Sequence, residues 1–353
     1  MQSPTLVRPP WSRPVSRRTL GFGAATITVA AGLLAACGRD DPAPAADGPP
    51  DQVTYTTNFG QLGRDAYAYV ALAKGFFAEA NLEVTIEPGS GTNPNLQALL
   101  GRQVQFTAVD MAGAILARNE QEGFVALAAI QQLPLAAVMT YADSGIAVPQ
   151  DLPGRSVGFP AGAVTELLFP AYAQLAGIDL DEVEQVGLEP AQLVPALAAG
   201  RVDAIGQFVV GEPLVAAAGD GREVVVLPYG EYVTDLYGVA LFTTTVLAEQ
   251  DPDLCVRFRT ALLRGLEYAM SNPAEAGRIL AEYAPETDPE VAAAEMALMI
   301  PYAQVLEPDH TLGWLDEARV VRSLAVMQSL AQSEPGLKAT DLVAFELTPG
   351  GAG

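Results

Sequence analysis

The sequence is poor in the side chains that most often carry out catalysis or bind metals. It has one histidine and two cysteines among 353 residues, which excludes most catalytic and metal-binding arrangements. Basic residues are also scarce, because 19 Lys and Arg stand against 42 Asp and Glu, for a net charge of −23. Contact with phosphates needs clustered Lys and Arg, so we expect no nucleic-acid partner. We expect no cofactor and no bound metal, and a binding protein rather than an enzyme.

The composition is otherwise typical of a folded protein. Half of the residues are hydrophobic and only 17% are charged, which excludes a disordered chain. At roughly 150 residues per domain, the length indicates two domains or one bilobal domain. The sequence contains no GxSxG, P-loop or HExxH motif and no paired-cysteine metal spacing. Cys255 lies in an apolar helical pattern and is predicted to be in the core, and His310 is predicted to stand at a helix start.

The N-terminal 36 residues have the pattern of an export signal. An apolar run from Leu20 to Ala36 follows four arginines, and no acidic residue occurs before Cys37. SRRTLGF (16–22) resembles a twin-arginine signature, and LAAC (34–37) resembles a lipobox, in which the cysteine is acylated. We predict a signal peptide at 1–36, a lipid on Cys37, and a Pro- and Ala-rich linker at 37–51. A single membrane-spanning anchor is the alternative, although the run is short for the roughly 20 residues that cross a bilayer.

After the linker, short β-rich runs alternate with helical patterns. Strands are predicted at 53–57, 82–88 and 104–110, with a helix from Asp65 to Ala80 and another from Pro94, capped by Asn93. Thr165 is predicted to cap a later helix that ends near Gly177. From about residue 243 the pattern is mostly helical. This order predicts an α/β protein with ligands near the carboxyl ends of its strands.

Three stretches of the sequence have a recognisable pattern: AYVALAKGFFAEANLEVTI (68–86), DSGIAVPQDLPGRSVGF (143–159) and LVPALAAGRVDAIGQFVVGEP (193–213). They resemble the bacterial solute-binding proteins of ABC importers, in the group that binds alkanesulfonates and thiamine pyrimidine precursors. The resemblance implies a two-lobed, type II periplasmic-binding-protein-like α/β fold with two crossovers and a helical C-terminal region. Lobe 1 would comprise 52–138 and 239–353, and lobe 2 would comprise 139–238. TTNFG (56–60) departs from the tryptophan and asparagine pattern of the pyrimidine-precursor binders.

Candidate ligand residues in lobe 1 follow the predicted strands. Arg64 can bind a sulfonate or carboxylate through its guanidinium, and Tyr67 can stack on a ring. The GSGTN turn (89–93) can offer backbone N–H groups to an anion at a helix start. Asp110 ends a strand and can accept from an amino or hydroxyl group. The ligand residues predicted in this lobe are Asn58, Phe59, Arg64, Tyr67, Ser90, Thr92, Asn93, Asp110 and Gln131.

Lobe 2 supplies a second set of candidates, from the loops that follow two of its predicted strands. Gly162, Thr165 and Glu166 open a helix, at the position where the family has its ligand loop. Phe208 is predicted to stack on a ring, and Glu212 to anchor a polar group. For each candidate the alternative is an ordinary structural role, such as Asp65 capping a helix or Arg64 pairing with Asp65.

The resemblance implies an extracytoplasmic component of an ABC importer, held on the outer face of the cytoplasmic membrane by lipid alone. It would act as a monomer and deliver a small solute to permease and ATPase subunits. A heterocycle such as a thiamine pyrimidine precursor is favoured, and an alkanesulfonate such as taurine is the alternative. A surface sensor lipoprotein is a third reading. The pyrimidine synthase enzymes of this fold need a cysteine-rich stretch that the sequence lacks.

These assignments predict opposite effects for two substitutions. Arg64→Ala is expected to abolish sulfonate binding and to leave heterocycle binding largely intact, because only the sulfonate needs the guanidinium. Phe208→Ala is expected to do the reverse, because only the flat ring needs a stacking partner. Titration of both variants with taurine and with an aminopyrimidine checks this, and loss of both ligands in either variant would contradict it.

Overall fold

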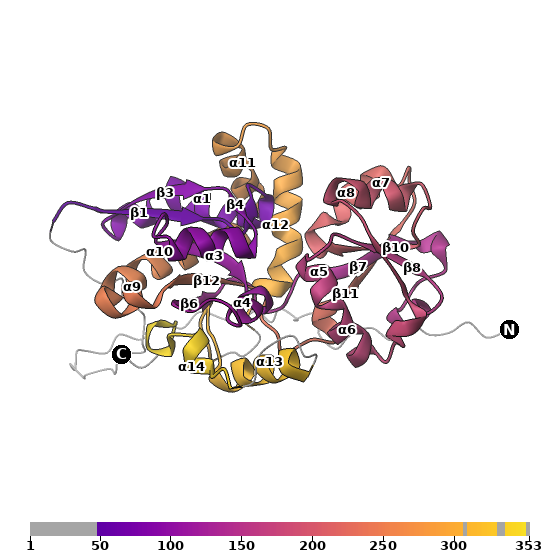
Figure 1. The fold of residues 1–353 in the computed structure, drawn as a ribbon. Coiled ribbons are helices and arrows are strands. Elements are labelled where there is room, and N and C mark those ends of the chain that lie inside the picture. Colours follow the sequence, from indigo (N-terminus) through magenta and orange to yellow (C-terminus); the bar gives the residue numbers. More distant parts are fainter. Residues whose placement is uncertain (1–47, 306–308, 330–335, 351–353) are drawn as a thin grey trace, which may run out of the picture. The chain divides into compact units, whose positions relative to one another are not determined.

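The computed structural model describes residues 48–305, 309–329 and 336–350. Within them the chain forms a mixed α/β fold with two five-stranded sheets (Figure 1). The predicted signal peptide, Cys37 and linker residues 38–47 lie outside the described residues. In the part of the chain that the structure describes, no helix is long and apolar enough to cross a bilayer.

The first sheet has the strand order β3-β1-β5-β12-β6. β1 runs parallel to β3 and β5, and β12 runs antiparallel to its neighbours β5 and β6. The strands are β1 (Asp51–Thr56), β3 (Leu82–Glu87), β5 (Phe106–Asp110), β6 (Phe124–Ala129) and β12 (Val239–Thr244). β12 therefore enters this sheet only after the chain has built the whole second sheet.

The second sheet has the strand order β11-β7-β10-β8-β9. β7 runs antiparallel to β10 and β11, whereas β8 runs parallel to β9 and β10. The strands are β7 (Ala136–Tyr141), β8 (Ser156–Phe159), β9 (Glu184–Gly187), β10 (Ala204–Phe208) and β11 (Val224–Pro228). We refer to the parts of the chain built on the first and second sheets as lobe 1 and lobe 2. The chain crosses between them twice, as the fold class predicts.

The first crossover lies earlier than predicted. Residues 136–138, which the sequence analysis assigned to lobe 1, belong to β7 and pair with β10 and β11 in the second sheet. The reason is that β6 and β7 are separated only by residues 130–135, a segment too short to contain another strand and its turn. A movement of the two lobes against each other stays a prediction.

The helices that cover the first sheet come from both early and late parts of the chain. α1 and the late helices α10, α11 and α12 pack on one another against lobe 1, as expected of the helical C-terminal region. The longer helices are α1 (Ala66–Ala73), α3 (Thr92–Leu100), α4 (Met111–Ala117), α6 (Phe169–Ala176), α8 (Glu212–Ala218), α10 (Pro252–Ser271), α11 (Pro273–Tyr283), α12 (Pro289–Ala303) and α13 (Glu317–Ser329). The shorter ones are α2 (Phe76–Glu79), α5 (Val164–Leu167), α7 (Leu193–Ala198), α9 (Thr245–Gln250) and α14 (Ala339–Leu342).

Three local predictions differ from the structure. The helix predicted from Asp65 to Ala80 is broken, because Gly75 adopts a left-handed conformation with φ of 76° between α1 and α2. α3 begins at Thr92 with Gly91 at its cap, so Asn93 lies inside the first turn rather than at the cap. Thr165 likewise lies within α5, whose cap residue is Ala163.

A buried amide joins the strand ends of lobe 1. Asn95 on α3 is 3% exposed, and its Nδ2 lies 2.9 Å from the carbonyl oxygen of Thr57 and 3.1 Å from that of Ala108. Its Oδ1 accepts a hydrogen bond from the backbone N–H of Ser90 at 2.9 Å. One side chain therefore fixes the loop after β1, the turn after β3 and the middle of β5 relative to one another.

Asn95→Ala is expected to lower the free energy of unfolding by about 3 kcal/mol, because it leaves buried backbone groups without partners. Gln97→Ala on the same helix is the matched control, since Gln97 is exposed and its removal should change stability by at most about 0.5 kcal/mol. Urea unfolding of both variants measures the difference. Equal midpoints for the two variants would show that the hydrogen bonds of Asn95 do not stabilise lobe 1.

Candidate functional site

The candidate site begins in the loop that leaves β1. This loop contains the short strand β2 (Phe59–Gly60), which pairs with β4 (Gly89–Ser90), and then enters a 3-10 turn, η1 (Gly63–Asp65). Thr57 is buried, and its hydroxyl donates to the carbonyl of Gly60 and accepts from the N–H of Gly89. The loop is therefore held by its own polar groups. Phe59, at its tip, is 53% exposed.

Arg64 is the most unusual side chain of this loop, since it is buried with only 6% of its surface exposed. Its Nε lies 3.8 Å from Oδ2 of Asp65, beyond hydrogen-bond distance, and neither atom has a hydrogen-bond partner among the described residues. Its guanidinium carbon lies 4.7 Å from the centre of the Phe208 ring, at the end of β10. A buried guanidinium with an unsatisfied donor is costly, and the cation–π contact offsets part of that cost.

Three carboxyl groups, those of Asp65, Asp110 and Glu295, interact electrostatically with Arg64. Burial raises the pKa of Asp65 to about 7, although the charge of Arg64 and the N–H of Asn58 oppose the shift. Burial also raises the pKa of Asp110 to about 6, against the N–H groups of Gly113 and Ala112 and the charge of Arg64. The pKa of Glu295 on α12 is raised by burial too, and lowered in part by Gly63 N–H and Arg64. The single positive charge is thus matched or exceeded by acidic groups.

Lobe 2 faces Arg64 with an aromatic ring and a buried hydroxyl near it. Phe208 is half-buried. Thr165 is 1% exposed, its hydroxyl has no hydrogen-bond partner among the described residues, and it packs beside Gly206, two residues before Phe208. The structure therefore brings together Arg64, Asp110 and Phe208 from the predicted set, and Thr165 lies beside Gly206 on the strand that ends at Phe208.

Other predicted ligand residues are buried in contacts with the protein itself. Tyr67 is 1% exposed, and its hydroxyl lies 2.9 Å from that of Tyr55 in the core, so its ring is not open to a ligand. Gln131 is 3% exposed, and its amide accepts from the N–H of Val239 and points at the sulfur of Met299. Gln131 therefore ties the two crossovers together. The hydroxyl-bearing side chain of Thr92 packs against Gly113 of α4.

The backbone N–H groups of the GSGTN turn (89–93) are only partly available to an anion. The N–H of Ser90 donates to Asn95 and that of Gly91 donates to the carbonyl of Asn58, so two of the backbone groups predicted for an anion already have partners. The side chains of Ser90 and Asn93 are exposed. In lobe 2, Glu166 accepts from the N–H of Gly162 at 2.5 Å and closes that loop on itself.

The remaining predicted residues lie at the edge of this cluster. Asn58 is half-buried, and its backbone N–H lies 3.4 Å from Oδ1 of Asp65. Glu212 is half-buried at the first position of α8, four residues after Phe208. Both side chains belong to loops that follow strand ends, the position from which α/β proteins contact their ligands.

Glu295, which approaches the Arg64 loop from α12, was not among the predicted ligand residues. Its Oε2 accepts a hydrogen bond from the backbone N–H of Gly63 at 2.6 Å. The signal in the sequence is that Glu295 is the one charged residue in the otherwise uncharged stretch VAAAEMALMIPYA (291–303). An isolated charge in such a helix usually has a specific partner.

The side chains most often used in covalent catalysis are placed elsewhere. Cys255 is fully buried in the core, as predicted, and burial raises the pKa of its thiol to about 12, which disfavours the nucleophilic thiolate. His310 is exposed and stacks on Trp314 in the turn before α13, which begins at Glu317, so it is not the start of that helix. Among the residues that the structure describes, no group of three or more His, Cys, Asp or Glu is placed to hold a metal.

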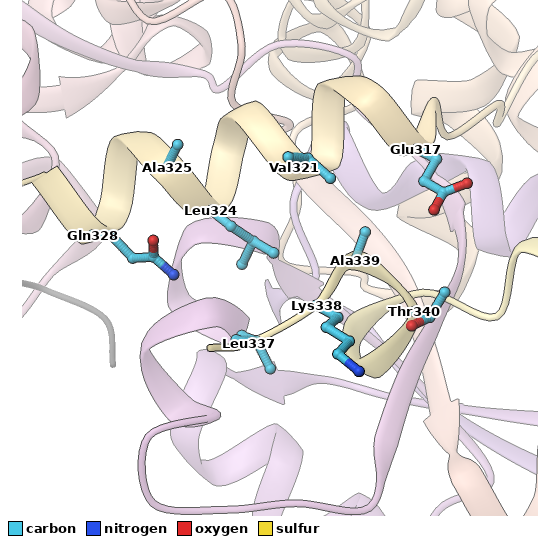
Figure 2. A pocket seen from close by; sticks show the side chains of 9 residues that line it. All are labelled: Glu317, Val321, Leu324, Ala325, Gln328, Leu337, Lys338, Ala339 and Thr340. Atoms are coloured by element: carbon cyan, nitrogen blue, oxygen red, sulfur yellow. The ribbon is translucent and has the colours of Figure 1, made fainter. Parts of the chain in front are cut away.

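A separate pocket of about 460 Å³ lies between α13 and the segment that enters α14 (Figure 2). Its walls include Val321, Leu324 and Ala325 from the helix and Leu337, Lys338 and Ala339 from the segment. None of the predicted ligand residues lines it. Its polar lining residues are Glu317, Gln328, Lys338 and Thr340 (Figure 2), and none of them belongs to the Arg64 cluster.

Comparison with known proteins identifies the family. The NMT1/THI5-like family model matches residues 65–276. The chain belongs to the NMT1/THI5-like family. It is 28% identical over 61% of its length to a formylaminopyrimidine-binding protein of Halalkalibacterium halodurans, and the match spans 65% of that protein. It is 26% identical to a riboflavin-binding protein of Chloroflexus aurantiacus, over 88% of this chain and 90% of the relative.

Solved structures confirm the fold. The aliphatic sulphonate-binding protein SsuA of Escherichia coli matches with a TM-score of 0.66 and 17% identity, over 84% of this chain and 99% of that one. The alkanesulfonate-binding protein SsuA of Xanthomonas axonopodis pv. citri, bound to MOPS, matches with a TM-score of 0.62 and 16% identity, over 85% and 99% of the two chains. The predicted periplasmic-binding-protein-like α/β fold is therefore confirmed.

The contact between Arg64 and Phe208 changes one expectation from the sequence. Because the guanidinium and the ring touch, removing either one alters the surroundings of the other. Arg64→Ala also leaves Asp65 and Asp110 without their nearby positive charge. The two substitutions are therefore expected to be coupled, and each should weaken a heterocycle as well as a sulfonate.

The raised pKa values of Asp65 and Asp110 predict how stability depends on pH. In the folded protein these groups keep protons above their ordinary pKa of 3.8, up to about 7 and about 6. Their contribution to the free energy of unfolding therefore falls as the pH rises from about 4 to about 7. In Asp65→Asn this contribution is absent, so stability should fall less across the window, by on the order of 1–3 kcal/mol.

Denaturant unfolding at pH 5, 6, 7 and 8 measures this effect in the wild type and in Asp65→Asn. Asp143→Asn is the matched control, because Asp143 is exposed and its removal should leave the pH dependence of the wild type in place. A slope of stability against pH that is the same in all three proteins would contradict the burial of an ionisable Asp65.

Proposed function

We propose that the chain is the extracytoplasmic solute-binding component of an ABC importer, and that it binds its ligand at the contact between lobe 1 and lobe 2. The observation that carries the proposal is the buried Arg64, which has an unsatisfied donor and meets Phe208 of the other lobe. A guanidinium offers five N–H donors and no acceptor. A ligand that accepts from it would supply the missing partner and would link the two lobes.

The charge around Arg64 favours a neutral heterocycle over an anion. Asp65, Asp110 and Glu295 all interact electrostatically with the arginine. A sulfonate would bring a further negative charge among them, whereas a heterocycle with N–H groups can donate to a carboxylate and accept from Arg64. The ring of Phe208 supplies a face for stacking. The relatives named as formylaminopyrimidine-binding and riboflavin-binding proteins support this class.

An alkanesulfonate is the second candidate. It is favoured by the unsatisfied guanidinium itself, because an arginine fork matches a sulfonate well. Under this alternative Asp65 would be protonated when the ligand is bound, so binding of taurine should strengthen as the pH falls through about 7. A heterocycle that donates to a carboxylate should show the opposite trend.

The other parts of the proposal are supported by the family and by the N-terminal sequence pattern. Binding without catalysis is supported by the buried Cys255 and by His310, which lies outside the Arg64 cluster. We propose that the protein is a monomer held at the outer face of the cytoplasmic membrane by a lipid on Cys37. Its partners would be the permease and ATPase subunits of the importer.

A thermal-shift panel tests the ligand class, with aminopyrimidines, thiamine, riboflavin, taurine, longer alkanesulfonates and nitrate at pH 6 and pH 8. A ligand at a hundred times its dissociation constant adds about 2.7 kcal/mol to the free energy of unfolding, so it should raise the melting temperature by several degrees. We expect shifts with a heterocycle and none with sulfonates or nitrate at pH 8.

Two arginine variants serve as a matched pair in this panel. Arg64→Gln should lose the ligand-induced shift, and Arg201→Gln should keep it, because Arg201 is an exposed residue at the surface of lobe 2. A shift with taurine alone would transfer the assignment to sulfonates. No shift with any compound, together with no small molecule released from the denatured protein in mass spectrometry, would overturn the proposed binding function.

A further inference from the structure

Helix α12 reaches the ligand loop from a distant part of the sequence. Glu295 accepts a hydrogen bond from the backbone N–H of Gly63 at 2.6 Å, across 232 residues of chain. Gly63 is the first residue of η1, and Arg64 is the next. The carboxylate of Glu295 therefore holds the backbone from which Arg64 projects.

The backbone of η1 and that of α12 lie in close contact at this point. A Cβ added to Gly63 would stand 2.2 Å from the carbonyl oxygen of Ala292, a distance that no real Cβ reaches. Ala292 and Glu295 are three residues apart on α12, so they lie on the same face of the helix. The loop cannot shift toward the helix, and the hydrogen bond keeps it from moving away.

Glu295 also acts on the charge of Arg64. Its carboxyl is half-buried, and its favourable interactions are with the N–H of Gly63 and the charge of Arg64. Like Asp65 and Asp110 it contributes negative charge beside the guanidinium, but it comes from a separate helix. Removing its charge is thus a way to change the electrostatics of the site while both Asp65 and Asp110 stay in place.

The same helix contacts the lobe 2 side of the site. α12 packs against η6 (Val209–Gly211), the turn that directly follows Phe208, and against α8. At its C-terminal end, the carbonyl of Tyr302 accepts from the N–H groups of Gln132 and Leu133 in the first crossover. In Figure 1, α12 is the orange helix that stands between α11 and the lobe 2 elements. One helix thus supports both partners of the Arg64–Phe208 contact.

We propose that Glu295 is a positioning residue of the ligand site, which fixes Arg64 through Gly63 and sets the preference of the site for neutral over anionic ligands. This inference rests on the proposed function, since it concerns the ligand class of the same site. The hydrogen bond to Gly63 and the negative charge are two separable contributions, because a glutamine at this position keeps an acceptor oxygen and loses the charge.

The two contributions predict different outcomes for two variants. Glu295→Ala removes both, and should weaken binding of the heterocycle about 10- to 100-fold, the range expected for a hydrogen bond to a charged group. Glu295→Gln keeps the hydrogen bond, so it should hold heterocycle affinity within about threefold of the wild type. It should also gain affinity for taurine about tenfold or more, because one of the three acidic groups that interact with Arg64 is gone. A purely structural role would not produce that gain.

The experiment is calorimetric titration of the wild type, Glu295→Ala, Glu295→Gln and Glu290→Gln with riboflavin, an aminopyrimidine and taurine. Glu290→Gln is the matched control, because Glu290 is an exposed residue in the first turn of the same helix. Hydrogen exchange of the amide of Gly63 is measured in the same proteins without ligand. We expect faster exchange in Glu295→Ala and wild-type protection in Glu295→Gln and in the control.

The outcomes separate this inference from the proposed function. If the wild type binds none of the three probes, the heterocycle assignment within the proposed function fails, and exchange at Gly63 still decides whether Glu295 holds the loop. If the wild type binds a heterocycle but Glu295→Gln behaves like Glu290→Gln toward taurine, the selectivity role is overturned. Unchanged exchange and unchanged affinity in Glu295→Ala would overturn the positioning role. Should Glu295→Ala fail to fold, the taurine affinity of Glu295→Gln remains decisive.

Discussion

The buried side chain of Asn95 is the constraint on which the rest of the site depends. Its amide joins the carbonyl group that directly follows β1, a carbonyl group in the middle of β5 and an N–H that follows β3. The residue is 3% exposed, so its partners depend on it rather than on bulk water. The loop that it holds after β1 continues to Arg64, which meets Phe208 of lobe 2.

The second constraint is electrostatic. The protein carries a net charge of −23, yet the buried cluster around Arg64 holds an arginine among carboxyl groups that keep their protons unusually well. Burial disfavours every ionised form, so the cluster settles close to electrical balance. A ligand that brings a further negative charge would disturb that balance, whereas a neutral ligand that donates and accepts hydrogen bonds would keep it.

The sequence predicted the residues whose position follows from strand ends. Arg64, Asp110 and Phe208 each stand within one loop or turn of a strand's carboxyl end, and the topology brought them to one place. Tyr67 and Gln131 are polar residues near the same loops, but their partners Tyr55 and Val239 are tertiary, so no local pattern shows that they are occupied. Glu295 was missed for the same reason, because its partner Gly63 lies 232 residues away. The family resemblance supplied the fold; it could not supply these pairings.

The position of β12 has a consequence for the order in which the molecule assembles. All five strands of the second sheet lie between residues 136 and 228, so they leave the ribosome as one uninterrupted block. The first sheet is incomplete until residues 239–244 insert between β5 and β6, and its ligand loop lacks its support until α12 has been synthesised. Such distant pairings are slow to form, and domains contiguous in sequence tend to fold as units during synthesis. Lobe 2 is therefore expected to begin folding first, and the contact of α12 with the ligand loop forms only in a nearly finished chain.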